Sequence, residues 1–91
     1  MKVKVKLFAN FREAAKQKEV IISPAGETVG DVIEGLAAQY PAIRPLLFQD
    51  GRLKPYVNVL HNAQTLKGED SLNRKVQDGD EIALFPPVSG G

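Results

Sequence analysis

Apolar and polar residues alternate along short stretches of this chain, the pattern of strands with one buried face. Within the sequence KVKVKLFA, the side chains of Val3, Val5 and Leu7 share one face and lysines occupy the other. Residues 2–9 are therefore predicted to form a half-buried strand. Further strands are predicted over residues 18–23, 56–62 and 81–85, with a short edge strand and a turn within 63–75.

One helix has clear boundaries in the sequence. Thr28 is a natural N-cap, and Asp31 three residues further on forms a shortened capping box that also complements the helix dipole. Pro41 ends the helix, because the residue before a proline is displaced from helical geometry. The apolar side chains between these signals recur at helical spacing and are Val29, Val32, Ile33, Leu36 and Tyr40.

Two further segments are predicted from composition and turn residues. Residues 10–18 are rich in helix-forming residues and predict a short helix between the first two strands. Residues 44–51 predict a loop with buried leucines that closes on an Asp-Gly turn.

The predicted elements follow the order strand, strand, helix, strand, short strand, strand. This order indicates an α+β domain in which one main helix packs on a mixed sheet of four to five strands. Core residues alternate in both the first and the last strand, so we expect these two strands to pair centrally. The β-grasp, or ubiquitin-like, arrangement fits this order. We expect residues 1–85 to form this domain and residues 86–91 to form a C-terminal tail.

The composition limits the functions open to the chain. Its 91 residues, 43% hydrophobic and 25% charged, suffice for one domain with a modest core. The net charge of +1 provides no overall field for nucleic acid or an anionic membrane. The absence of cysteine excludes disulfides, thiolate catalysis and cysteine metal sites. With no signal-peptide pattern and no apolar run of the ~20 residues that span a bilayer, we expect a cytoplasmic protein.

The chain ends on FPPVSGG, residues 85–91. Pro86 and Pro87 cannot continue a sheet ladder and favour extended geometry. The terminal glycines carry no side chain, so such an arm can thread a narrow channel of another protein. The terminal carboxylate is a poor electrophile, and no phosphate-binding motif accompanies it, so its activation requires a partner enzyme. The alternative is an inert end.

Two stretches of the sequence carry a family resemblance. VQDGDEIALFPPVSGG, residues 76–91, combines an Asp-Gly-Asp turn with an acidic-hydrophobic strand, Pro-Pro and Gly-Gly. VKLFANFREAA, residues 5–15, covers the first strand and the start of the first helix. Together they resemble the small, sulfur-carrying subunits of molybdopterin synthase, the MoaD-like family, and its archaeal-type members. The resemblance covers nearly the whole chain and is weakest across residues 62–75.

This resemblance implies that the C-terminal carboxylate of Gly91 is the reacting group and carries sulfur as a thiocarboxylate. An E1-like adenylating enzyme of the MoeB type activates the carboxylate with ATP and Mg²⁺, and a sulfur donor protein provides the sulfur. The MoaE-like large subunit of molybdopterin synthase then accepts the tail and transfers the sulfur to precursor Z. The chain alone is expected to be non-catalytic and to bind no cofactor. The inserted arm consists of Pro86, Pro87, Val88, Ser89 and Gly90.

Two other classes of function stay open at this stage. Archaeal relatives can also be joined through the same carboxylate to protein lysines, and related carriers serve tRNA thiolation or thiamine synthesis. A β-grasp interaction or RNA-binding module with an inert terminus is the third possibility. Such a module would tolerate the loss of Gly90 and Gly91.

Side-chain parity predicts a docking surface beside the tail. If Ile82 and Leu84 face the core, Ala83 and Phe85 face outward, as Phe8 does from the first strand. Should these strands be neighbours, Phe8, Ala83 and Phe85 form an exposed patch for a partner. The alternative is that one phenylalanine is buried under the 44–51 loop.

The remaining polar residues are interpreted as structural. His61 has no companion His or Cys, so no metal site is predicted. Lysines 2, 4 and 6 are expected to form a solvated sheet face rather than an RNA contact. The acidic residues are assigned to turns rather than to a carboxylate site, and they are Glu69, Asp70, Asp78, Asp80 and Glu81.

Overall fold

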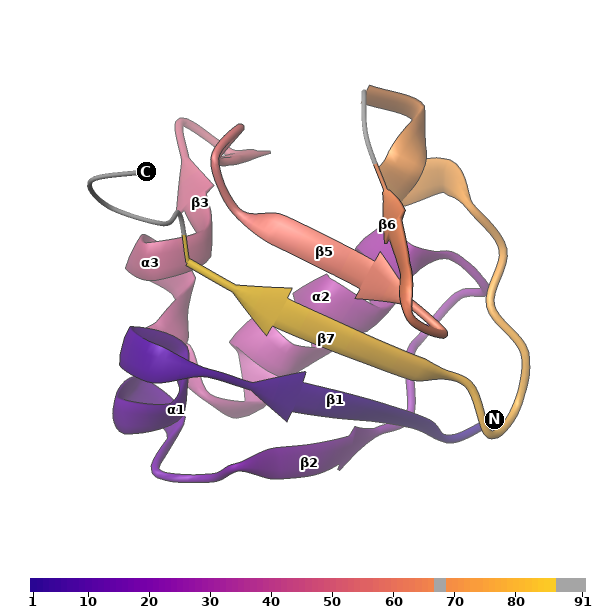
Figure 1. Ribbon diagram of the computed structural model, residues 1–91, viewed down its shortest axis with the longest axis horizontal. Helices are drawn as coiled ribbons and strands as arrows, with labels where there is room; N and C mark the ends of the chain where they lie inside the picture. Colours follow the sequence, from indigo (N-terminus) through magenta and orange to yellow (C-terminus); the bar gives the residue numbers. More distant parts are fainter. Residues whose placement is uncertain (67–68, 87–91) are drawn as a thin grey trace.

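The computed structural model describes residues 1–66 and 69–86 and is built on a five-stranded sheet (Figure 1). The strands lie in the order β2-β1-β7-β5-β6. β1 is parallel to β7 and antiparallel to β2, while β5 is antiparallel to both β7 and β6. The expected central pairing of the first and last strands is confirmed. The bounds are β1 Val3–Leu7, β2 Glu19–Ile22, β5 Asn58–His61, β6 Gln64–Leu66 and β7 Glu81–Phe85.

The main helix, α2 (Val29–Gln39), crosses one face of this sheet and lies behind it in Figure 1. The middle of the opposite face carries no helix. A mixed sheet that wraps one helix, with the first and last strands adjacent at its centre, is the β-grasp arrangement. The α+β prediction is therefore confirmed.

The ends of α2 follow the sequence signals. The Thr28 hydroxyl oxygen accepts the backbone N–H of Asp31 at 3.2 Å, and the Asp31 carboxylate accepts the backbone N–H of Thr28 at 3.2 Å. These reciprocal bonds satisfy donors that the first helical turn leaves free. The helix ends with Tyr40 as its C-cap, directly before Pro41.

The core lies between α2 and the inner face of the sheet. Val3, Val5 and Leu7 of β1 are at most 1% exposed, which confirms the period-two prediction. Ile82 and Leu84 of β7 are fully buried beside them. Burial of such side chains, at roughly 25 cal/mol per Å² of apolar surface, is the main drive for this layer to form. The helix contributes Val29, Val32, Ile33, Leu36 and Ala37 to the same core.

A short helix, α1 (Ala9–Ala15), follows β1 and is contained within the predicted segment 10–18 apart from its first residue. Phe11 and Ala15 turn inward, and Phe11 is only 1% exposed. The helix ends at Lys16, whose backbone is left-handed with φ 59° and whose N–H donates to the carbonyl of Arg12.

The segment predicted as a loop over 44–51 is more ordered than expected. A short 3-10 helix at Pro41–Ile43 leads into α3 (Arg44–Leu47), and the hairpin of β3 (Phe48–Gln49) and β4 (Arg52–Leu53) follows. Prolines near the start of each helical piece explain this, because a proline there lacks only a donor that would be unpaired anyway. The predicted Asp-Gly turn joins the two hairpin strands, and Leu47 is buried as expected.

The segment 63–75, predicted to hold a short edge strand and a turn, contains β6 and a 3-10 helix at Glu69–Asn73. β6 is an edge strand, as anticipated. Across the described residues, no helix combines the length and the apolar character needed to cross a bilayer. Of the predicted tail, Pro86 is described and residues 87–91 lie outside the described part.

The left-handed C-cap of α1 makes a stability prediction. A non-glycine residue in this conformation costs about 1–2 kcal/mol, whereas glycine loses about 0.5–1 kcal/mol of chain entropy on folding. Lys16→Gly is therefore expected to stabilise the domain by about 0.5–1 kcal/mol in urea unfolding. Gln17→Gly, at the exposed neighbour without a positive φ, should lower stability and serves as the control. Equal effects from both substitutions would contradict this interpretation of the cap.

Candidate functional site

The uncovered face of the sheet carries an aromatic pair where β1 and β7 end. The register sets Lys6 beside Ala83 and Leu7 beside Leu84, so the next positions bring Phe8 beside Phe85. Their rings stack with centroids 4.2 Å apart and planes inclined by 10°. Neither ring belongs to the buried core, and both are half-buried. The pairing predicted from parity is thus present, and the alternative of one ring under the 44–51 segment is not.

The backbone after β1 explains how Phe8 stays on the outer face. Phe8 continues the strand with φ −128° and ψ 153°. Ala9 then adopts φ 51°, which turns the chain sharply and carries Phe11 to the core. A positive φ is unfavourable for alanine, so the surrounding contacts must hold this junction. The strained residue, Ala9, directly follows Phe8 of the aromatic pair.

Ala83 lies on the same face but contributes less surface than expected. The register places Lys6 on one side of it and Leu60 on the other. Its side chain points away from the core, as predicted, but it is only 8% exposed because these larger neighbours flank it. Ala83 therefore offers almost no contact surface of its own.

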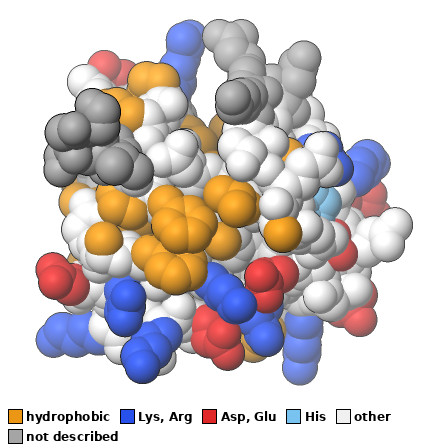
Figure 2. Space-filling model, viewed as in Figure 1, with side chains coloured by type: hydrophobic (Ala, Val, Ile, Leu, Met, Phe, Trp, Pro, Cys, Tyr) orange, Lys and Arg blue, Asp and Glu red, His pale blue; other side chains and the backbone are white. Residues whose placement is uncertain are grey.

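A mostly apolar pocket opens at this end of the sheet, and Figure 2 shows hydrophobic side chains gathered at the middle of the same face. Charged side chains border this cluster in the view, and Lys6 pairs with Glu81 at 3.5 Å. We call this surface the outer-face patch. Its lining residues are Phe8, Ala9, Asn58, Leu60, Thr65, Phe85 and Pro86.

The chain leaves the sheet at the edge of this patch. β7 ends at Phe85, and the carbonyl of Pro86 accepts a hydrogen bond from the side-chain amide of Asn58 at 3.3 Å. Sequence reasoning gave no role to Asn58 or Leu60. The parity argument could have found both, because β5 pairs with β7 and its even-numbered positions share the outer face. The predicted arm residues Pro87, Val88, Ser89, Gly90 and Gly91 lie outside the described residues.

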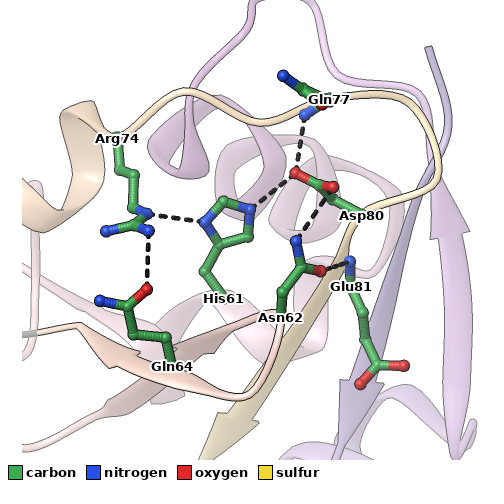
Figure 3. A network of polar contacts seen from close by, with 7 residues as sticks. All are labelled: His61, Asn62, Gln64, Arg74, Gln77, Asp80 and Glu81. Atoms are coloured by element: carbon green, nitrogen blue, oxygen red, sulfur yellow. Dashed lines mark hydrogen bonds and ion pairs between the residues drawn. The ribbon is translucent and has the colours of Figure 1, made fainter.

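A second polar cluster surrounds His61, which is 7% exposed (Figure 3). Arg74 donates through Nε to Nδ1 of His61 at 2.9 Å. The ring proton therefore lies on Nε2, which is 2.7 Å from Oδ2 of Asp80. Arg74 also donates to the side chain of Gln64 at 2.9 Å. His61 thus connects the end of β5 to the segment that precedes β7, through Arg74 on one side of its ring and Asp80 on the other.

The carboxylate of Asp80 is held in its charged form. The hydrogen bond from His61, followed by that from the backbone N–H of Gln77, lowers the pKa of Asp80 below its usual 3.8. The side chain of Asn62 donates a further bond at 3.2 Å. The neighbouring Asp78 accepts the backbone N–H of Lys2 at 2.7 Å, so both carboxylates of the Asp-Gly-Asp turn have structural partners.

These arrangements define the class of site. The described part of the chain contains no group of three or more His, Cys, Asp or Glu residues able to hold a metal ion. The outer-face patch is a mostly apolar surface at the exit of the C-terminal segment, and its lining contains no His, Asp, Glu, Lys or Tyr side chain. The fold and this surface are those of a ubiquitin-like small protein.

Comparison with known families assigns the chain more narrowly. The profile of the ThiS family matches residues 5–91, which is nearly the whole sequence. The chain belongs to the ThiS family of ubiquitin-like sulfur-carrier and modifier proteins.

The individual relatives include both modifier proteins and a sulfur carrier. Small archaeal modifier protein 3 of Haloferax volcanii is 39% identical over 92 residues, covering 100% of both chains. Small archaeal modifier protein 1 of the same organism is 41% identical over 88 residues, covering 94% of this chain and 97% of the relative. The molybdopterin synthase sulfur carrier subunit of Escherichia coli is 36% identical over 89 residues, covering 98% and 99%.

Solved structures agree with this assignment. The crystal structure of SAMP1 from Haloferax volcanii superposes with a TM-score of 0.89 at 39% identity, over 100% of both chains. The Amycolatopsis orientalis BexX/CysO complex contains a chain that matches with a TM-score of 0.80 at 27% identity, covering 98% of this chain and 99% of that one. The latter relative is thus seen bound to another protein.

The His61 cluster makes a pH prediction. Because the folded pKa of Asp80 is lowered, its stabilising contribution is present above the unfolded value of 3.8 and is lost as the pH falls through the folded value. The unfolding free energy of the wild type should therefore fall more steeply below about pH 4 than that of Asp80→Asn. Urea unfolding between acidic and neutral pH measures this. Asp50→Asn, in the exposed hairpin turn, is the control and should keep the wild-type slope.

Proposed function

We propose that this protein is the sulfur-carrier small subunit of molybdopterin synthase and carries sulfur as a thiocarboxylate on Gly91. The observation that carries the proposal is the position of the outer-face patch at the end of β7. A partner that covers Phe8 and Phe85 meets the beginning of the segment that ends in Gly-Gly. Body and tail can then be recognised together by one partner.

In this chemistry the chain provides the acyl group at Gly91, and its folded domain is the part that the partner enzymes bind. The Gly91 carboxylate attacks the α-phosphate of ATP on an adenylating enzyme, and pyrophosphate leaves. A persulfide on a donor protein then replaces AMP at the acyl carbon, and a thiol reduces the resulting acyl disulfide, which releases the thiocarboxylate and leaves a disulfide on the donor side. The large synthase subunit takes the tail, the thiocarboxylate sulfur bonds to precursor Z, and water then hydrolyses the acyl–sulfur bond, which restores the carboxylate. ATP and Mg²⁺ act on the adenylating partner, so this chain needs no nucleotide site.

Protein modification is the second candidate. The similarity to small archaeal modifier proteins 1 and 3 over nearly the whole chain favours it. The chemistry is compatible, because the same acyl-adenylate can react with a lysine amine to give an amide. The two functions share the activation step and differ in the nucleophile that takes the acyl group.

The activation step gives the first functional prediction. Intact-mass measurement after incubation with a cognate adenylating enzyme, ATP and a sulfide source should show one oxygen replaced by one sulfur. Deletion of Gly91, or extension of the chain beyond it, should abolish the gain and leave the unfolding transition unchanged. No gain in the wild type beside an enzyme proven active on another carrier would refute the carrier function.

The acceptor separates the two candidates. Transfer of sulfur from the purified thiocarboxylate to precursor Z, in the presence of the large synthase subunit, is expected for the synthase role. Accumulation of lysine-linked adducts of the wild type in cells, without sulfur transfer in that assay, would instead assign the chain as a modifier.

The outer-face patch gives a prediction about partner binding. Phe8→Ala removes half of the aromatic pair. It should raise the KM of the adenylating enzyme for this carrier about tenfold or more, as loss of a central interface aromatic does. Thiocarboxylate formation at varied carrier concentration measures this. Ile21→Ala is the matched control, because Ile21 is 52% exposed on the edge strand β2 and pairs with Lys4, away from Phe85. An unchanged KM for Phe8→Ala would remove the patch from the docking surface.

A further inference from the structure

The sheet ladder stops abruptly where the tail begins. Asn58 is the register partner of Phe85, and the next pair would be Val57 with Pro86. Pro86 has no N–H to donate. The N–H of Val57 is also committed, because it donates to the carbonyl of Lys54 at 3.1 Å. Within the described residues, the ladder between β5 and β7 therefore ends at the pair of Asn58 and Phe85.

The side chain of Asn58 makes the contact that the backbone cannot. Its Nδ2 donates to the carbonyl oxygen of Pro86 at 3.3 Å. Asn58 is the first residue of β5 and points to the outer face, on the same side as Phe85. Among the described residues, this is the one side-chain hydrogen bond given to Pro86. A side-chain hydrogen bond, instead of a backbone one, therefore connects Pro86 to the first residue of β5.

Covalent restraints make this contact effective. A residue that precedes a proline is confined to extended backbone, and this applies to Phe85 before Pro86 and to Pro86 before Pro87. The φ of Pro86 is fixed by its ring. The backbone of Phe85 and Pro86 therefore has few accessible conformations. The stack of Phe85 on Phe8 restrains this short segment at one end, and the hydrogen bond from Asn58 restrains it at the other.

We propose that Asn58 is a positioning residue for acyl transfer: its side-chain amide fixes Pro86 against the sheet and thereby aims the C-terminal segment into the partner docked on the outer-face patch. This role rests on the proposed function, because it needs a partner that takes up the tail. Asn58 touches neither the reacting carboxylate nor ATP. It reduces the number of directions in which the tail leaves a docked carrier.

The expected effect is modest and lies in one kinetic constant. Loss of a single exposed hydrogen bond changes a conformational equilibrium by about two- to tenfold. Docking through the patch is retained without it, but fewer docked carriers present the tail correctly. Asn58→Ala should therefore lower kcat for thiocarboxylate formation about two- to tenfold. The KM for the carrier should stay near its wild-type value, and the effect should be the same for either acceptor reaction.

The test compares three variants in the adenylation and sulfuration assay, with the reaction stopped at intervals and followed by intact mass. Asn58→Ala removes the donor, and Asn58→Gln keeps an amide donor on a longer side chain and should recover part of kcat. Asn73→Ala is the matched control, because it truncates an exposed asparagine at the end of the 3-10 helix that is not among the lining residues of the outer-face patch. Thermal unfolding of each variant gives a readout that is independent of the partner.

The outcomes separate this role from the proposed function. The positioning role would be established by three results together. The wild type gains sulfur, Asn58→Ala shows a lower kcat with an unchanged KM, and Asn58→Gln recovers part of the lost kcat. An unchanged kcat, a rise in KM alone, or a loss of thermal stability matching the loss of activity would overturn it while leaving the carrier function intact. Failure of the wild type itself to gain sulfur would overturn the carrier function and this role with it.

Discussion

The parallel pairing of β1 with β7 is the interaction on which the rest of this structure depends. It joins the first strand of the chain to the last at the centre of the sheet, and the adjoining turns are bonded across it, as from the N–H of Gly79 to the carbonyl of Lys2 at 2.8 Å. The same register buries Leu7 beside Leu84 and brings Phe8 beside Phe85. One pairing thus sets both the core on the inner face and the aromatic pair on the outer face.

The elements with strong periodicity could be predicted from the sequence. β1 has strict alternation, and α2 has both a capping box and an apolar stripe, so local signals and tertiary packing agree there. The segment from Pro41 to Leu53 could not be predicted in the same way. Its helical pieces span one turn or less and its strands two residues each, too short to show a period. Their order comes from packing against the core, as the burial of Ile43 and Leu47 indicates.

In the candidate site, too, one part could be predicted from the sequence and another could not. Parity alone brought Phe8, Ala83 and Phe85 to one face, because it requires only the alternation of each strand and one pairing. The environment of His61 depends on Arg74 and Asp80, which are 13 and 19 residues away in the chain. Contacts of this kind follow from loop paths that residue patterns do not encode. The sequence pattern could show that His61 has no companion His or Cys, but it could not show that the ring connects Arg74 to Asp80.

The position of β7 has a mechanical consequence. Ladder bonds run across the strands, β7 has a partner along each side, and the chain leaves from its end. A pull along the tail, in line with β7, therefore loads both ladders in shear, so that many hydrogen bonds resist together instead of opening one after another. Insertion of the tail into a partner, as proposed above, would apply such a pull, and this strand arrangement favours a domain that stays folded under it.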